Sequence, residues 1–236
     1  MSNYFDSERF VSVFPKIISN LGVNFHIVFW SMLLGTILAV FVAVIRLKGI
    51  PAVRQIMGVY VSFMRGTPLL VQMLIAYYGI PLLFGDFFQN LLGVNLNRIE
   101  PVVFVEIAIV LNEGAFLGEI FRGAILAVPA IQSEAAYSIG MTGTQTFIRI
   151  ILPQFVRIAI PHYGVDMVGV FQNTSLVFTL GVIDVLGKAK TVGQATGHTL
   201  EGYVAATIIY IAFSLILKGA FILLEKQLSA GNTIAA

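Results

Sequence analysis

The residues of this sequence that could do chemistry are a few carboxylates set inside long apolar stretches. Glu106 and Glu113 lie in one stretch, and Asp166 lies in another. An ionised side chain at the centre of a membrane-spanning helix costs roughly 2.5 kcal/mol or more unless it faces protein or water. At about 100° per residue, Glu106 and Glu113 fall on nearly one helix face. We therefore expect these carboxylates to point inward, away from lipid.

Amide side chains accompany the carboxylates. Asn112 directly precedes Glu113, and Gln172 and Asn173 follow Asp166. On their helix, an arc of about 60° contains His162, Asp166, Gly169 and Asn173. Glu113 and Asn173 should then lie at similar depth near the midplane. Such groups either line a path for a polar solute or pair across helices to fix packing, and both interpretations remain open.

The composition describes the elements that must position these residues. The chain is 58% hydrophobic and 11% charged, and it has no cysteine. Soluble domains carry roughly 25% charged residues, so the expected solvent is a bilayer. Only helices satisfy their backbone in such segments. The candidate spans are about Leu21–Ile45, Gly66–Gly85, Pro101–Ile120, Pro161–Leu180 and Tyr203–Leu224.

The basic residues predict the orientation of these five spans. One side holds nine lysines and arginines: Arg46, Lys48, Arg54, Arg65, Arg122, Arg149, Arg157, Lys218 and Lys226. The other side holds five: Arg9, Lys16, Arg98, Lys188 and Lys190. By the positive-inside rule the N-terminus is outside and the C-terminus inside.

A polar segment between the third and fourth spans carries a motif with helix-end signals. It reads E-A-A-x3-G-x9-I-x-L-P over Glu134, Ala135, Ala136, Gly140 and Ile150 to Pro153. Ser133 predicts an N-cap, Glu134 puts negative charge at a positive helix end, and Gly140 suits the stop. We expect a helix of roughly two turns outside the bilayer. The segment resembles the cytoplasmic loop by which permease subunits of ABC importers engage their ATPase.

Other segments extend this resemblance to permeases for polar amino acids. They are R-G-T-P-L-L-V-Q over residues 65–72, Glu119 to Gly123, Val128-Pro129, and Asn173 to Leu176. Gln172-Asn173 departs from the Lys-Asp pair that is commoner in relatives. The segment Asp184 to Lys190, leading through His198 to Tyr203, looks like a loop of permeases for cystine and related sulfur compounds.

The chain is thus identified as a member of the type I ABC importer permeases, with one transmembrane domain over residues 1–236 and a cytoplasmic coupling loop at about 130–153. The resemblance implies an all-α fold of five spans with a coupling helix, in the cell membrane of a prokaryote. It implies two ATPase subunits, an extracytoplasmic binding protein, a second permease subunit (itself or a paralogue) and membrane lipid as partners. It also implies that the permease performs no covalent chemistry. No G-x4-G-K-S/T loop occurs, so ATP–Mg²⁺ is expected in a partner chain and no cofactor in this one.

The resemblance assigns roles to the polar residues. Glu113, with Asp166 and Glu106, would attract the ammonium of a zwitterionic substrate, and Asn112, Gln172 and Asn173 would offer hydrogen bonds. Cystine carries two ammonium groups, which suits several carboxylates, but arginine, lysine or histidine would be served as well.

Two other classes of protein compete with this interpretation. One is a secondary carrier that uses Glu106, Glu113 and Asp166 as proton relays. The other is a membrane-embedded enzyme, which the scattered His26, His162 and His198 disfavour as a metal site. A nucleic-acid partner would need a clustered basic face, and the sequence shows no such cluster.

Overall fold

The computed structural model describes residues 5–197 and 199–230, and all regular elements in these ranges are helical. Two short elements, η1 and η3, are π-helices, and η2 and η4 are 3₁₀-helices. In chain order the elements are α1 Ser7–Ile18, α2 Leu21–Lys48, α3 Pro51–Gly66, α4 Leu69–Leu74, η1 Ile75–Gly79, α5 Ile80–Leu92, η2 Leu96–Arg98, α6 Pro101–Leu126, α7 Ala130–Ser138, α8 Gly143–Thr146, η3 Phe147–Ile151, α9 Leu152–Asn173, η4 Thr174–Leu180, α10 Val185–Thr196 and α11 Thr199–Ala230.

Long apolar helices dominate the molecule. Four runs in the described chain are long and apolar enough to cross a membrane: Ser7–Lys48, Leu69–Leu92, Pro101–Leu126 and Thr199–Leu228. A further pair, Gly143–Leu180 and Val185–Thr196, passes the same test together and bends by 47°. Each predicted span overlaps one of these runs, so the structure supports four or five spans.

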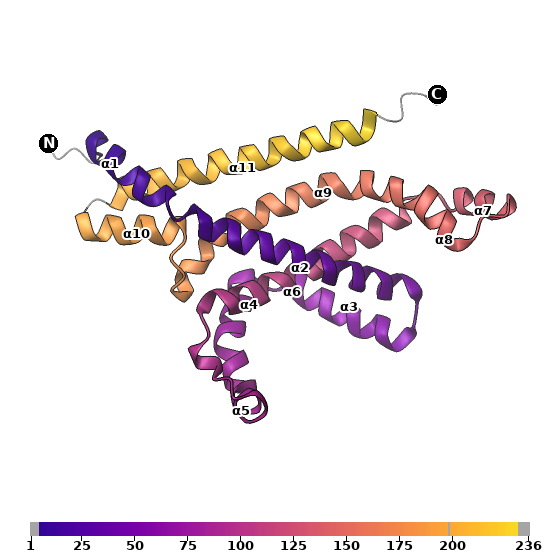
Figure 1. Cartoon of the computed structure of the whole chain (residues 1–236), viewed down its shortest axis with the longest axis horizontal. Helices are drawn as coiled ribbons and strands as arrows, with labels where there is room; N and C mark the ends of the chain where they lie inside the picture. The colour runs from indigo at the N-terminus through magenta and orange to yellow at the C-terminus, as the bar shows by residue number, and fades with distance from the viewer. Residues whose placement is uncertain (1–4, 198, 231–236) are drawn as a thin grey trace.

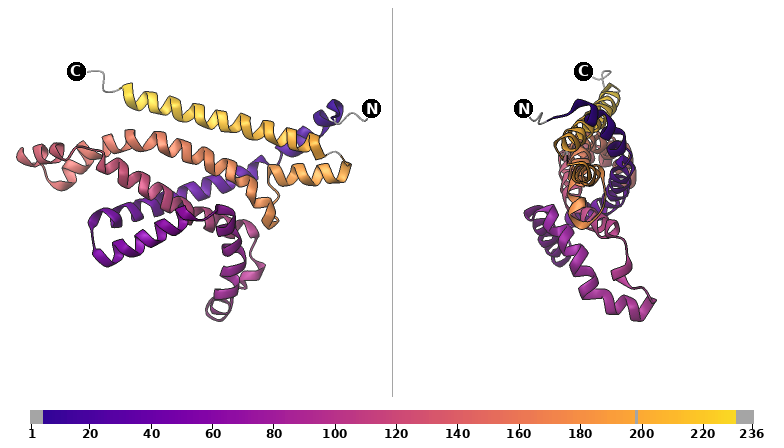
Figure 2. Two further views of the ribbon diagram at one scale, coloured as in Figure 1. Left: turned by 180° about the vertical axis from the view of Figure 1, so that it is seen from behind. Right: turned by 90° about the vertical axis from the view of Figure 1, so that its left-hand side faces the viewer.

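The helices lie roughly along one axis of an elongated body (Figure 1). α2, α6 and α9 form its middle, and α11 runs beside α9. α1 and α10 lie at one end of the body, and α7 and α8 lie at the other. α3 doubles back beside α2, whereas α4 and α5 project sideways as an arm (Figure 2).

The predicted boundaries of two spans need correction. The connection expected between the first two spans contains a full helix, α3, so Arg54 and Arg65 are helical. The second apolar run begins at Leu69 because Pro68 interrupts the helix. In the fourth span, α9 begins at Leu152, nine residues before the predicted start, and the apolar segment ends as a 3₁₀-helix.

Small residues bring α2 and α6 together. Gly114 and Gly118 lie one turn apart on α6. A Cβ atom on Gly114 would come within 2.5 Å of Leu38, and one on Gly118 within 2.8 Å of Val42. This close approach of two backbones is the packing that membrane helices use, because apolar side chains gain little by leaving lipid for each other.

The break before α4 is closed by one amide side chain. Thr67 is extended, so the last carbonyl groups of α3 have no partner in the next turn. The Nε2 atom of Gln72 donates to the carbonyl oxygens of Met64 at 2.8 Å and Thr67 at 3.1 Å. The R-G-T-P-L-L-V-Q segment therefore contains both a helix break and the residue that satisfies it.

A buried polar cluster ties α10 to the body. The Nδ2 atom of Asn24 donates to Thr174 Oγ1 at 2.7 Å, and the Tyr210 hydroxyl donates to Asp184 Oδ2 at 2.6 Å. The other oxygen of Asp184 accepts from the Gly187 backbone at 2.8 Å and caps α10. Asn24, Asp184 and Thr174 are fully buried. The segment expected to be an outer loop is thus a helix anchored to α2, η4 and α11.

Candidate functional site

Two of the predicted site residues face each other in the middle of the body. Glu113 on α6 is 4% exposed, and its side chain occupies the space that Gly35 on α2 leaves free. Its carboxyl group interacts directly with that of Asp166 on α9. One oxygen of each carboxyl is buried without a hydrogen-bond partner in the described chain. Two carboxylates in contact need a proton or a cation between them, so this pair can hold a cationic group.

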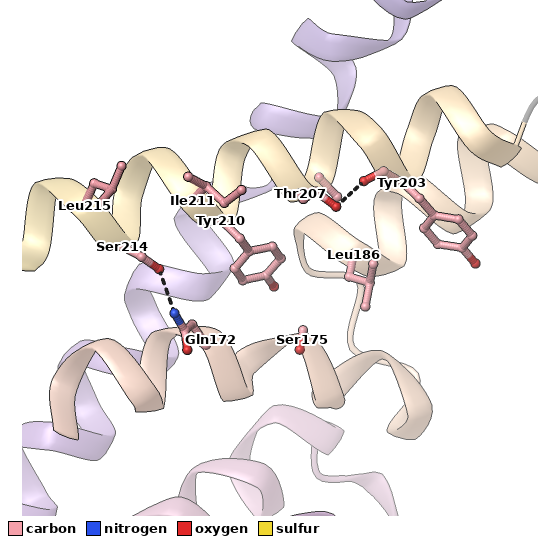
Figure 3. A pocket seen from close by; sticks show the side chains of 10 residues that line it. Gln172, Ser175, Leu186, Tyr203, Thr207, Tyr210, Ile211, Ser214 and Leu215 are labelled. Carbon is pink, nitrogen blue, oxygen red and sulfur yellow. Dashed lines mark hydrogen bonds between the residues drawn. The ribbon is translucent and has the colours of Figure 1, made fainter. Parts of the chain in front are cut away.

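The two amides at the end of α9 point in different directions. Asn173 follows Asp166 by seven residues, which returns it to within about 20° of the same face, whereas Gln172 is turned by about 120°. Asn173 is exposed. Gln172 donates to Ser214 Oγ at 3.3 Å in a cavity of about 510 Å³ between α9, α10 and α11 (Figure 3). Asn173 therefore shares a face with the carboxyl pair, and Gln172 does not.

Asn112 serves the helix break described above. Its Nδ2 atom donates to Gln72 Oε1 at 2.9 Å and to the carbonyl oxygen of Met64 at 3.1 Å. The first bond holds α4, and the second holds the end of α3, against α6. The position of Asn112 in a span can be predicted from the sequence. Its hydrogen-bond partners cannot, because they lie 40 residues or more away along the chain.

Glu106 has a partner that the sequence did not suggest. The Nε2 atom of His26 on α2 lies 3.2 Å from its Oε1 atom, and the Glu106 side chain is 18% exposed. This ion pair lies two turns of α6 from Glu113. His162 is exposed on α9. His198 lies outside the described residues.

The six predicted residues thus form separate groups in the structure. Glu113 and Asp166 meet, with Asn173 on the same face of α9. Glu106 pairs with His26, Asn112 with Gln72, and Gln172 with Ser214. The Glu113–Asp166 pair is the strongest candidate site, because two carboxyl groups meet there and each has a buried oxygen without a hydrogen-bond partner among the described residues.

The coupling segment folds as a short helix, but it begins earlier than predicted. α7 starts at Ala130 after Pro129, so Ser133 is not its N-cap and Glu134 lies inside the helix. Pro129 has an extended backbone and no N–H group, which suits the residue that ends one helix and begins the next. The predicted helix start and the charge effect at the helix end are therefore wrong.

The predicted end of this helix is confirmed. Gly140 has a φ of 84°, in the left-handed region that favours glycine. The Met141 N–H donates to the Ala136 carbonyl at 3.1 Å, and the Gly140 N–H donates to the Tyr137 carbonyl at 3.0 Å. These two bonds form a Schellman motif.

The coupling segment presents apolar side chains at the tip of the molecule. Ile131 is 71% exposed and Ile139 is 79% exposed. Glu134 and Ala135 are also exposed, whereas Ala136 is buried. α7 and α8 lie beyond the ends of the long helices (Figure 1). An apolar patch on such a projecting segment is typical of a protein interface.

An ion cluster holds α2 to α6 on the side of α7. Glu119 accepts from Arg46 Nε at 3.0 Å through Oε1 and from Arg122 Nη2 at 2.7 Å through Oε2. The Glu119 side chain is 12% exposed. The sequence motif contains Glu119 and Arg122, but the contact with Arg46 joins residues 73 positions apart.

Comparisons with known proteins agree with this architecture. A family model described as the binding-protein-dependent transport system inner membrane component matches residues 31–230. The L-cystine transport system permease protein TcyL of Bacillus subtilis (strain 168) is 36% identical, over an alignment that covers 99% of this chain and 95% of TcyL. HisQ of Salmonella typhimurium, a histidine/lysine/arginine/ornithine transport system permease protein, is 35% identical and covers 73% of this chain and 75% of its own.

A solved structure gives the same result. The crystal structure of an amino acid ABC transporter with histidines matches with a TM-score of 0.82 and 27% identity, over 94% of this chain and 99% of that chain. The chain therefore belongs to the binding-protein-dependent transport system inner membrane component family, as an amino-acid ABC transporter permease.

Proposed function

We propose that this permease forms half of the translocation path of an ATP-driven importer, and that Glu113 and Asp166 bind the ammonium group of an amino acid in that path. The observation that carries the proposal is the contact between two carboxyl groups, each of which has one buried oxygen without a hydrogen-bond partner in the described residues. A cationic group placed between them relieves their repulsion. Asn173, on the same face of α9, would supply a hydrogen bond.

The proposed substrate class is L-cystine and related sulfur amino acids. TcyL and a second relative, the L-cystine transport system permease protein TcyB of Bacillus subtilis (strain 168), at 34% identity over 92% of this chain, support it. Cystine brings one ammonium group for each half of a two-subunit path. Basic amino acids are the alternative, since HisQ is 35% identical and a second cation would also suit two carboxyl groups.

In the proposed importer, the second half of the path, the ATPase activity and the delivery of substrate are supplied by other protein chains. A two-fold path requires a second permease, either a copy of this chain or a paralogue. Two ATPase subunits, which bind ATP–Mg²⁺, would dock on the exposed apolar side chains of the coupling loop, and an extracytoplasmic binding protein would deliver substrate. The chain lies in the prokaryotic cell membrane with its N-terminus outside, surrounded by lipid.

The test is uptake by the whole complex reconstituted in vesicles. Radiolabelled L-cystine is supplied with the binding protein, and unlabelled L-cystine, L-arginine, L-lysine and L-histidine compete. We expect ATP-dependent uptake that cystine inhibits most. Inhibition by the basic amino acids alone would replace the proposed substrate class. Uptake driven by a pH gradient without ATPase subunits would favour a secondary carrier and overturn the proposed function.

A further inference from the structure

A polar pocket lies where α5 and η2 meet the beginning of α6. Its volume is about 540 Å³, and its lining includes Tyr77, Tyr78, Asp86 and Asn97. None of these four side chains forms a hydrogen bond or an ion pair within residues 5–197 and 199–230. Asp86 is an exposed carboxylate, so the pocket combines one negative charge with uncommitted hydroxyl and amide groups.

The aromatic rings of this pocket are held in place. The Tyr77 ring packs edge-to-face against Tyr78 at 4.8 Å between centroids and against Phe104 at 5.9 Å. The Tyr78 side chain is 65% exposed. A cation above an aromatic ring is attracted by the π-electrons, and a neighbouring carboxylate adds direct charge attraction. The pocket therefore suits an ammonium or guanidinium group.

The pocket is separate from the Glu113–Asp166 pair. Phe104 at its edge precedes Glu113 by nine residues on α6, which is about 13 Å along the helix. η2 leads into the end of α6 that lies away from α7, on the arm that projects from the body (Figures 1 and 2). In the proposed orientation this end is the extracytoplasmic one. A large partner can therefore reach the pocket without entering the translocation path.

The charges of the lining decide which cation fits. The lining residues include Asp86 but no lysine, arginine or histidine. A free amino acid or a phospholipid headgroup would bring its own negative group, which no cation in the lining would receive. A lysine or arginine side chain of a protein brings positive charge alone.

We propose that this pocket, formed around Asp86, Tyr77 and Tyr78, receives a lysine or arginine side chain of the extracytoplasmic binding protein when that protein docks. The inference rests on the proposed function, because it assumes a binding protein on the side of η2. It adds a docking residue to the importer, and it makes docking dependent on ionic strength.

The experiment measures docking on the complete complex in lipid nanodiscs, with labelled binding protein at several salt concentrations. Asp86→Asn keeps the shape of the side chain and should weaken docking about fivefold to tenfold, because the ion pair is lost while the Tyr77 and Tyr78 rings remain. Asp86→Lys should weaken it further. Glu100→Gln is the matched control, since Glu100 is another exposed carboxylate near the start of α6 and lies outside this pocket.

Rescue identifies the partner group. A binding-protein variant in which the docking lysine or arginine is changed to glutamate should dock to the Asp86→Lys permease. The same variant should dock poorly to the wild-type permease. Normal docking of both Asp86 variants, or equal losses in Glu100→Gln, would overturn the inference. Unchanged docking with loss of free L-arginine binding would make the pocket a solute site instead. If uptake needs no binding protein at all, the proposed function fails, whatever the Asp86 variants do.

Discussion

Glu113 packs against Gly35, which has no side chain at the point where α2 crosses α6, and its carboxyl group interacts with that of Asp166 on α9. The sequence could flag each carboxylate, since a charge in an apolar stretch is costly wherever it points. It could not say which of them share a site, because that depends on how α6 and α9 are rotated against each other. Glu106 shows the limit: its partner His26 lies on another helix, 80 residues away in the sequence.

Removal of one charge from the pair should weaken substrate binding without weakening the fold. Glu113→Gln removes a charge-assisted contact of about 1.5–3 kcal/mol, so the transport affinity should fall roughly tenfold to hundredfold. Thermal stability of the purified complex should hold or rise, because a repulsion between buried carboxyl groups is removed. Uptake against substrate concentration and a melting curve measure the two effects. A joint fall of stability and transport would make Glu113 a packing residue.

The Glu106 variant should behave in the opposite way. Glu106→Gln breaks the ion pair with His26, so we expect a modest loss of stability, about 1 kcal/mol or less, since the His26 side chain is 54% exposed. Transport affinity should change less than twofold, because this carboxylate faces the His26 ring and lies about two turns of α6 from Glu113. The same uptake and melting assays apply. A loss of affinity as large as that of Glu113→Gln would place Glu106 in the substrate site.

Helices and their approximate limits could be predicted from apolar stretches, but several starts and breaks could not. The helix end at Gly140 follows from local chemistry, because only glycine adopts a positive φ without strain. The predicted beginning of α7 was wrong. Ser133 is a good N-cap residue by type, but the helix already begins at Ala130, after Pro129. The cluster of Asn24, Asp184 and Tyr210 was missed because it joins three elements distant in sequence.

α6 links the candidate site to the coupling helix, and Glu119 fastens it to α2. Glu119→Gln should lower the free energy of unfolding by about 2 kcal/mol, since charged hydrogen bonds to Arg46 and Arg122 are weakened. We also expect more ATP hydrolysed per amino acid transported, because α2 and α6 no longer move together. Parallel ATPase and uptake measurements give this ratio. The exchanged pair Arg46→Glu with Glu119→Arg should recover part of both losses.

Substitutions on the exposed face of α7 should separate coupling from folding. The Glu134 side chain is exposed and has no hydrogen-bond or ion-pair partner among the described residues, so the ATPase expected to dock on α7 can reach it. Glu134→Lys should therefore leave membrane insertion and the melting temperature unchanged, while substrate-stimulated ATP hydrolysis falls at least tenfold. Gly140→Ala adds backbone strain of roughly 1–2 kcal/mol but meets no atom within 4 Å, so its effect should be smaller. Normal stimulation in Glu134→Lys would remove α7 as the coupling element.

The whole molecule has two distinct ends, and its function depends on which end faces the cytoplasm. α7 lies at one end, and α1, α10 and the buried cluster around Asp184 lie at the other (Figure 1). The sequence predicts the orientation only from an unequal distribution of lysine and arginine, nine against five. That rule concerns insertion and does not use the fold, so it needs a test of its own.

The absence of cysteine from the sequence makes that test clean. Single substitutions Asn90→Cys on α5, in the projecting arm, and Ala135→Cys on α7, at the tip of the body, each place one exposed thiol on the protein. In intact cells, a membrane-impermeant maleimide should label Asn90→Cys, because α5 leads to the extracytoplasmic start of α6. Ala135→Cys should react only after the membrane is opened, because the coupling helix must face the ATPase and its ATP supply. The reverse labelling pattern would mean that the protein has the opposite orientation in the membrane. Both the coupling role of α7 and the docking role of Asp86 would then be wrong.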